Sequence, residues 1–75
     1  LIGVNIMTSE RQIIIKLPRV KEITTLSRAT IYRRMDEGKF PKQIKLSARA
    51  SAWVEQEVLD WLDSCIEDRY KNDNE

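Results

Sequence analysis

Histidine is absent from this sequence of 75 residues, and cysteine occurs once, as Cys65. The absence of histidine removes the commonest general base and the commonest zinc ligand. A single cysteine can form neither an internal disulfide nor a multi-cysteine metal site, and it fits a reducing compartment. The sequence also lacks nucleotide-binding loops, nucleophile motifs and metal-ligand spacings. We therefore expect a protein that is not an enzyme and that uses no cofactor and no metal.

Long apolar runs are missing as well. No stretch approaches the roughly 20 apolar residues that cross a bilayer. Residues 1–7 are too short, and lack the basic flank, for a secretory signal. These features predict no membrane partner and a cytoplasmic location. A chain of this length is expected to form one domain that buries only about 60% of its unfolded surface, which leaves little room for a deep substrate cavity.

What the sequence does contain is a marked separation of charge. The whole chain has a net charge of +1. Residues 27–49 hold seven basic and two acidic side chains, whereas residues 50–75 hold two basic and eight acidic ones. Such a distribution attracts a polyanion to the middle of the chain and repels it from the end. Chance clustering in a short chain is the alternative explanation.

The middle of the basic block has the pattern of a short helix over residues 27–37. Ser27 suits the N-cap, because its hydroxyl can accept from the free amides of the first turn. Gly38 can end the helix in a left-handed conformation. Helical periodicity separates an apolar face of Ile31, Tyr32 and Met35 from a polar face of Thr30, Arg33 and Arg34. The polar face can offer donors to base edges and cations to phosphates, or it can be an ordinary solvated face.

A shorter helix is expected before it, over Arg19–Thr25, because Pro18 suits a first helical turn. Two short helices joined by a tight turn, with cations on the second, form a helix-turn-helix arrangement. The usual glycine of that turn is replaced here by Thr25 or Leu26. Further upstream, Ile13–Ile15 is a β-branched run that predicts either a short strand or an extended arm.

Residues 40–53 predict a two-stranded hairpin, or wing. Pro41 favours extended backbone before it, and the alternation that follows places Ile44 and Leu46 toward the core. The small, polar stretch Ser47–Ser51 is expected to form the tip of the hairpin.

Such a short hairpin is marginal by itself, so it must lean on the helices. Phe40 and Trp53 are the natural anchors for that contact, and Arg49 lies near the tip.

The longest helix is expected over residues 54–69. Its apolar residues recur at the spacing of one helical face: Val54, Val58, Trp61, Leu62 and Cys65. We expect Trp61 in the core and Cys65 as a small buried group. The chain then reads as a mostly α-helical fold with a small β-hairpin, namely three helices plus a two-stranded wing over residues 13–69. Residues 1–12 are expected to be a flexible tail and residues 70–75 a disordered one.

Several of these segments together resemble the AlpA family, whose members are small phage- and prophage-derived transcriptional regulators related to excisionase-type and MerR-type winged-helix domains. The resemblance spans residues 13–68 and rests on Val20–Ile23, Leu26–Arg33, Glu37–Leu46, Trp53 and Val58–Leu62. It implies a bacterial, winged helix-turn-helix protein that binds DNA. The role would be transcription control or, alternatively, that of a recombination directionality factor (excisionase).

We therefore predict sequence-specific binding of double-stranded DNA, with helix 27–37 in the major groove and hairpin 40–53 as the wing. The residues predicted to contact bases or the groove are Ser27, Arg28, Thr30 and Arg33. Phosphates are assigned to Tyr32, Arg34, Lys39, Lys42, Lys45 and Arg49, with the ring of Tyr32 packed and its hydroxyl free. The competing hypothesis is a protein-interaction module, in which the acidic last helix docks an integrase, RNA polymerase or another copy of the chain.

Overall fold

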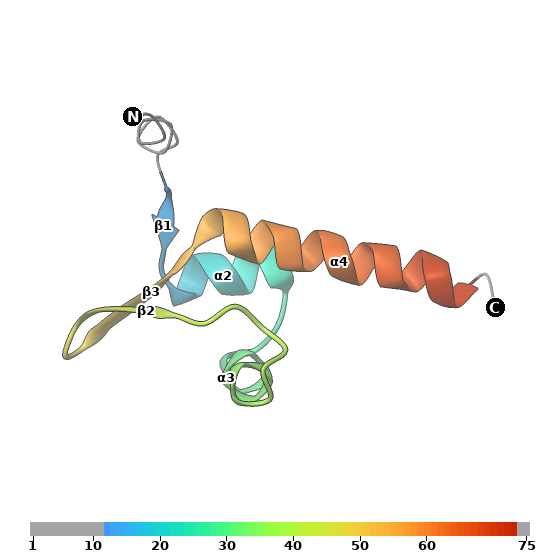
Figure 1. Cartoon of the computed structure of the whole chain (residues 1–75). Coiled ribbons are helices and arrows are strands. Elements are labelled where there is room, and N and C mark those ends of the chain that lie inside the picture. The colour runs from blue at the N-terminus through green and yellow to red at the C-terminus, as the bar shows by residue number, and fades with distance from the viewer. Residues whose placement is uncertain (1–11, 74–75) are drawn as a thin grey trace, which may run out of the picture.

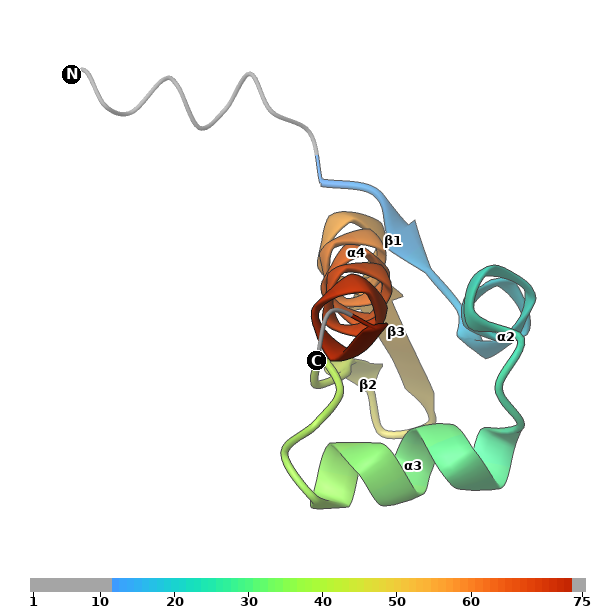
Figure 2. The same ribbon diagram turned by 90° about the vertical axis from the view of Figure 1, so that its right-hand side faces the viewer.

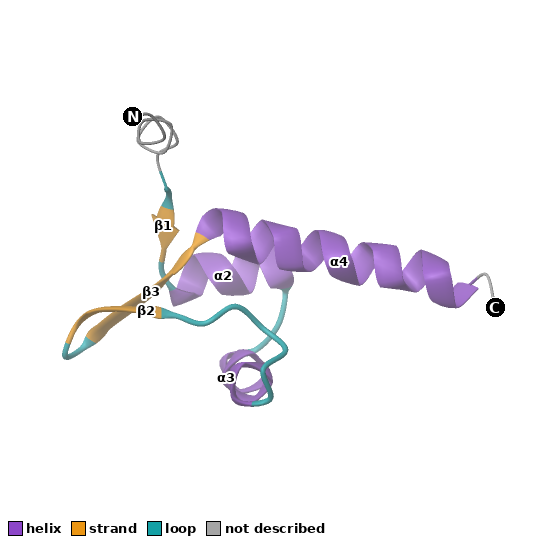
Figure 3. Ribbon diagram, in the orientation of Figure 1, coloured by secondary structure: helices purple, strands orange, loops and turns teal. Residues whose placement is uncertain are grey.

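Three helices and three short strands make up the part of the chain that the computed structural model describes, residues 12–73 (Figures 1 and 3). In chain order they are β1 (Ile14–Ile15), α2 (Leu17–Thr24), α3 (Arg28–Asp36), β2 (Ile44–Ser47), β3 (Ala50–Val54) and α4 (Glu55–Asp73). The predicted fold, mostly helical with a small hairpin, is confirmed. Of the predicted tails, residues 1–11 and 74–75 lie outside the described residues.

The strands form a small antiparallel sheet in the order β1-β3-β2. β1 pairs with β3 so that Ile15 lies opposite Trp53. Just beyond this pair, the amide of Glu55 donates to the carbonyl of Ile13 over 2.8 Å. The run of isoleucines is therefore a strand rather than an extended arm. The two strands of the predicted wing belong to a sheet of three, because β1 covers the second edge of β3.

α2 begins slightly earlier than predicted and carries Pro18 in its first turn. At its end Thr24 is buried, and its hydroxyl donates to the carbonyl of Val20 over 2.8 Å and accepts from the amide of Leu26 over 3.2 Å. Thr25 then adopts a left-handed backbone with a φ of 61°. That conformation favours glycine, so the turn has the geometry of a glycine turn although the chain places threonine there.

Both ends of α3 are formed by the residues predicted to form them. Ser27 is the N-cap, and its Oγ accepts from the amide of Thr30 over 3.2 Å. At the other end Gly38 has a φ of 73°, and its amide donates to the carbonyl of Met35 over 3.1 Å. Ile31 is fully buried on the inner face. Figure 2 shows α3 lying across the molecule, with α4 above it.

β2 and β3 form the predicted hairpin, but two details of the prediction are wrong. The turn at the tip consists of residues 48–49, so the predicted tip over Ser47–Ser51 is too long. Leu46 is 53% exposed instead of facing the core, whereas Ile44 is half-buried. A register shift interrupts the alternation within β2, and the hairpin extends beyond the helices (Figure 1). Leu46 consequently has no core to enter.

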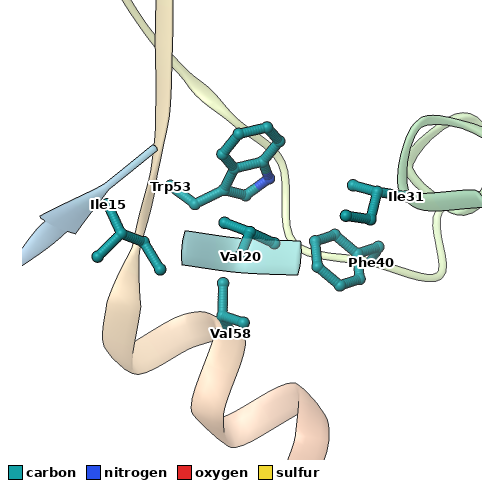
Figure 4. Close-up of a cluster of buried hydrophobic side chains, with 6 residues drawn as sticks. All are labelled: Ile15, Val20, Ile31, Phe40, Trp53 and Val58. Carbon is teal, nitrogen blue, oxygen red and sulfur yellow. The ribbon is translucent and has the colours of Figure 1, made fainter. Parts of the chain in front are cut away.

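One side chain from each of six segments builds the core (Figure 4). The six are Ile15, Val20, Ile31, Phe40, Trp53 and Val58. The predicted anchoring of the hairpin by Phe40 and Trp53 is thus confirmed. Trp61 packs against this cluster at the edge of the Phe40 ring, with centroids 4.8 Å apart, and its Nε1 donates to the carbonyl of Lys39 over 2.8 Å.

α4 corrects the sequence-based expectation at both ends. Val54 is the last residue of β3, and the helix continues to Asp73, which assigns helix to residues 70–73 of the predicted disordered tail. Cys65 is exposed rather than buried. The reason is that residues 63–70 lie on a part of α4 that projects past the other elements (Figure 1), where no other helix or strand within residues 12–73 covers the apolar stripe. Within residues 12–73, no helix has the length and apolar character needed to span a membrane.

Candidate nucleic-acid interface

The side chains that the sequence assigns to bases extend from the N-cap of α3 to its last turn. Arg28, Arg33 and Ser27 are exposed, and Thr30 is half-buried. The Ser27 hydroxyl donates to the Oγ1 of Thr30 over 3.0 Å, in addition to accepting from its amide. These two hydroxyls therefore hold the start of the helix together. Arg28 and Arg33 are the long donors of α3: Arg28 stands at the positive end of the helix dipole, and Arg33 lies in the last turn.

Tyr32 lies at the border between the exposed face and the core. Its ring stands edge-on to that of Trp53 in β3, with centroids 6.2 Å apart and an interplanar angle of 72°. Its hydroxyl donates to the Oε1 of Gln43 over 3.4 Å. Arg28 approaches the same ring, with its guanidinium carbon 4.9 Å from the centroid. The predicted packed ring is confirmed, whereas the hydroxyl has a partner instead of being free.

Arg34 departs from the predicted outer face. It is half-buried, and its Nε is shielded from solvent without a hydrogen-bond partner among residues 12–73. The prediction grouped it with Arg33, but on a helical wheel Arg34 lies only about 60° from buried Ile31, whereas Arg33 lies about 160° from it. The loop that follows Gly38 returns over this flank of α3, where the amide of Lys39 donates to the carbonyl of Arg34 over 2.8 Å. Arg33 alone keeps the exposure that was predicted for both.

A cleft of about 430 Å³ joins the last turn of α3 to the beginning of the wing. Its lining consists of Met35, Asp36, Lys42, Gln43 and Lys45. Both lysines are exposed, so the structure brings two of the predicted phosphate contacts to one place beside the helix. Gln43 was not among the predicted site residues. Its position between the two lysines in the sequence was the available signal.

The remaining predicted cations lie at the two extremes of the wing segment. Lys39 is exposed directly after the end of α3, and Arg49 is exposed in the turn at the tip of the hairpin. Neither lines the cleft. Arg49 extends the reach of the basic surface along the hairpin rather than adding to the cleft.

Most of the acidic side chains lie on α4; Glu22 on α2 and Asp36 and Glu37 at the end of α3 are the exceptions among residues 12–73. Exposed acids along it are Glu57, Asp60, Asp63, Glu67 and Asp68. Glu55 and Glu57 stand in the first turn, where the helix dipole favours negative charge. Figure 1 shows the end of α4 projecting away from α3. The charge separation in the sequence is thus a separation between elements, with the basic side chains on α3 and the wing.

A helix-turn-helix whose second helix is exposed, followed by an antiparallel hairpin, is the arrangement of a winged helix-turn-helix domain. Comparison with known families agrees with this class. Residues 13–66 match the family described as prophage CP4-57 regulatory protein (AlpA), and the chain belongs to that family.

Two relatives show how the family members are described. The uncharacterised protein ORF88 of Enterobacteria phage P4 is 38% identical over 56 residues, which cover 75% of this chain and 61% of ORF88. The DNA-binding transcriptional activator AlpA of Escherichia coli strain K12 is 34% identical, over 65% of this chain and 79% of that protein. The chain therefore spans less than two thirds of the length of ORF88.

Proposed function

We propose that this chain binds double-stranded DNA in a sequence-specific manner, with α3 in the major groove and the β2–β3 hairpin as the wing. The observation that carries the proposal is the Ser27-capped helix α3, which presents Arg28 and Arg33 to solvent and whose last turn borders a cleft lined in part by Lys42 and Lys45. An arginine that pairs with guanine contributes about 1–3 kcal/mol of discrimination. Lysines beside it suit phosphates, which set the register of the helix on the duplex.

The biological role that we infer is transcriptional regulation rather than catalysis, exerted on DNA in the bacterial cytoplasm. Support comes from the family and from the relative described as a DNA-binding transcriptional activator. The same contacts would also serve a recombination directionality factor. Footprinting across the genomic neighbourhood separates the two roles, because a regulator protects a promoter and a directionality factor protects a recombination site.

The direct test measures retardation of duplex DNA by the wild-type chain and two alanine variants. We expect Arg33→Ala to weaken binding about tenfold or more, as loss of one bidentate base contact does. Arg69→Ala is the matched control, because Arg69 is also an exposed helical arginine but lies on the projecting part of α4. Equal binding by all three proteins, or no binding by the wild type, would contradict the proposal.

A second candidate function is docking of a basic protein segment on the projecting part of α4. Ile66 and Tyr70 are 45% and 57% exposed there. Acidic side chains such as Asp63 and Glu67 stand on the same exposed stretch. Charge complementarity therefore favours a cationic partner, since two copies of this helix would bring like charges together.

This second candidate predicts a separation of activities. In a reporter assay, the double variant Ile66→Ser, Tyr70→Ser should lose regulation while it retains DNA binding in vitro. Sedimentation of the wild-type chain supplies the control. A stable dimer that the double variant abolishes would mean that the occupant is a second copy, which contradicts a basic partner protein.

A further inference from the structure

Tyr32 contacts three different parts of the molecule with one side chain. Its ring faces the guanidinium of Arg28 and the ring of Trp53, and its hydroxyl donates to Gln43. We propose that Tyr32 is a positioning residue, which holds the Arg28 guanidinium for base recognition and ties its position to the wing. This inference rests on the proposed DNA binding and assigns a determinant of its specificity.

The first half of the argument concerns Arg28. Arg28 is the first residue of α3, and Tyr32 follows one turn later, at the spacing that brings side chains together on a helix surface. An exposed arginine ordinarily samples many rotamers, and it loses that freedom when it binds a base. A guanidinium stacked 4.9 Å from an aromatic centroid is already restricted. Part of the side-chain conformational entropy of Arg28 is thus already lost in the free protein, so less is lost on binding and the affinity rises.

The second half concerns what holds Tyr32 itself. Trp53, against which the ring packs, is 1% exposed and belongs to the core, so the ring has a rigid support. Gln43, the partner of the hydroxyl, lines the cleft between α3 and the wing. The place of Arg28 is therefore set relative to the hairpin as well as to its own helix. The base contact of Arg28 and the phosphate contacts of the wing would then be held at a fixed position relative to each other.

A merely structural role for Tyr32 makes a different prediction. If the ring only packs against the core, its loss weakens the fold and reduces binding to every duplex alike. A positioning role instead reduces discrimination at the base pair that Arg28 contacts. Moreover, the effects of changing Tyr32 and Arg28 must be non-additive, because the two residues act through one contact.

The experiment begins with a duplex selected from a randomised library by the wild-type chain. Affinities for this duplex, and for a shuffled one, are measured with Tyr32→Leu, Arg28→Ala and the double variant. We expect Tyr32→Leu to lose roughly threefold to fivefold in affinity for the selected duplex, the range of an exposed cation–π contact. Repeating the selection with Arg28→Ala identifies the base pair that Arg28 reads. Tyr32→Leu should relax the preference at that same base pair, and it should add less than about twofold when Arg28 is already alanine.

Two variants guard against misreading a folding defect. Tyr32→Phe keeps the ring that supports Arg28 and loses the hydrogen bond to Gln43, so it should retain the preference at the base pair that Arg28 contacts while losing part of the affinity that the tie to the wing provides. Tyr70→Leu is the matched control, because Arg69 stacks on Tyr70 at 4.8 Å in α4, away from the proposed interface. That variant should leave both affinity and base preference unchanged. In the DNA-free protein, the Arg28 side-chain proton resonances should show a ring-current shift that Tyr32→Phe preserves and Tyr32→Leu removes.

The outcomes separate the failure of this inference from that of the proposed function. If the wild type selects no duplex, DNA binding itself is overturned, and the positioning role with it. If the wild type selects a duplex but Tyr32→Leu and Arg28→Ala act additively, DNA binding stands and the positioning role is overturned. A uniform loss of binding to selected and shuffled duplexes by Tyr32→Leu, with base preference intact, overturns it too.

Discussion

Thr25 is the residue whose backbone conformation fits its side chain least. It has a φ of 61° in the turn between α2 and α3, and it is β-branched. Such residues are rarely found at positive φ, and the conformation stores roughly 1–3 kcal/mol of strain. The turn persists because its surroundings hold it: the Thr25 amide donates to the carbonyl of Lys21 over 2.7 Å, and buried Thr24 anchors the end of α2.

We expect Thr25→Gly to stabilise the protein. Glycine removes the steric strain but adds unfolded-state freedom of about 0.4–1 kcal/mol, so the free energy of unfolding should rise by about 1 kcal/mol. A gain of that size raises the melting temperature of a small domain by about 4–8 °C. Thermal unfolding followed by circular dichroism measures it. Thr25→Ala keeps a Cβ at the same φ and should gain less; a lower melting temperature for the glycine variant would show that the turn is not strained.

Cys65 and Leu46 show where residue-level prediction from the sequence failed. Both lie on patterns that indicate burial, yet both are exposed. Periodicity identifies which face of an element is apolar, but not how far along that face the neighbouring elements reach. Burial of Val20, Ile31 and Val58 was correctly indicated by the same patterns, because these residues lie where other elements cover them.

At the scale of elements, α3 combines a structural cap with a proposed contact surface. Ser27 caps the helix and is also exposed at its proposed DNA-facing end. Its hydroxyl has two partners on Thr30, which makes the capping role the observed one. Substitutions that keep the cap and change the charge can separate this role from a contact with DNA.

Ser27→Ala should lower the free energy of unfolding by about 1 kcal/mol, the usual cost of a lost N-cap. Ser27→Asp preserves the cap and hence the stability, but its carboxylate faces the proposed phosphates. DNA affinity should then fall by about tenfold, since a like charge near a phosphate costs at least about 1 kcal/mol. Ser27→Asn is the neutral control, which keeps both properties. Undiminished affinity of the aspartate variant in a retardation assay would remove this end of α3 from the interface.

Local sequence signals determine the ends of an element better than they determine its partners. The serine cap and the glycine stop of α3 act within one turn, so the sequence was sufficient to predict them. The isoleucine run left a strand and an arm equally open, because strand formation depends on pairing with β3 about 40 residues later. α4 likewise continues beyond its predicted end, since polar helix formers do not by themselves stop a helix.

At the scale of the whole molecule, the charges are divided between the wing side and α4. The exposed cations between α3 and α4 are Lys39, Lys42, Lys45 and Arg49, whereas most of the acids lie along α4. A nearly neutral protein can therefore present a strongly basic surface to a polyanion. The affinity for DNA should then depend steeply on salt, because each neutralised phosphate releases counterions.

If these four cations each neutralise one phosphate, a plot of log binding constant against log salt should have a slope of about −4. The double variant Lys42→Ala, Lys45→Ala should reduce that slope to about −2, because two phosphate contacts are lost. Fluorescence titration at several salt concentrations measures both slopes. Arg19→Ala is the control, since the Arg19 guanidinium already pairs with Glu22 at 3.0 Å on α2. A slope that the double lysine variant leaves unchanged would place the cleft outside the DNA interface.

The sequence by itself determined the class of this protein and most of its elements, because caps, turns, periodicity and charge blocks act over a few residues. Tertiary structure alone decided which side chains meet: it joined Gln43 to Tyr32, packed the ring of Tyr32 against Trp53, and left residues 63–70 of α4 exposed. Those outcomes depend on contacts between segments far apart in the chain, such as α3 with β3 and the loop before β2. Local sequence patterns do not encode contacts between distant segments, because these contacts form only when the core packs.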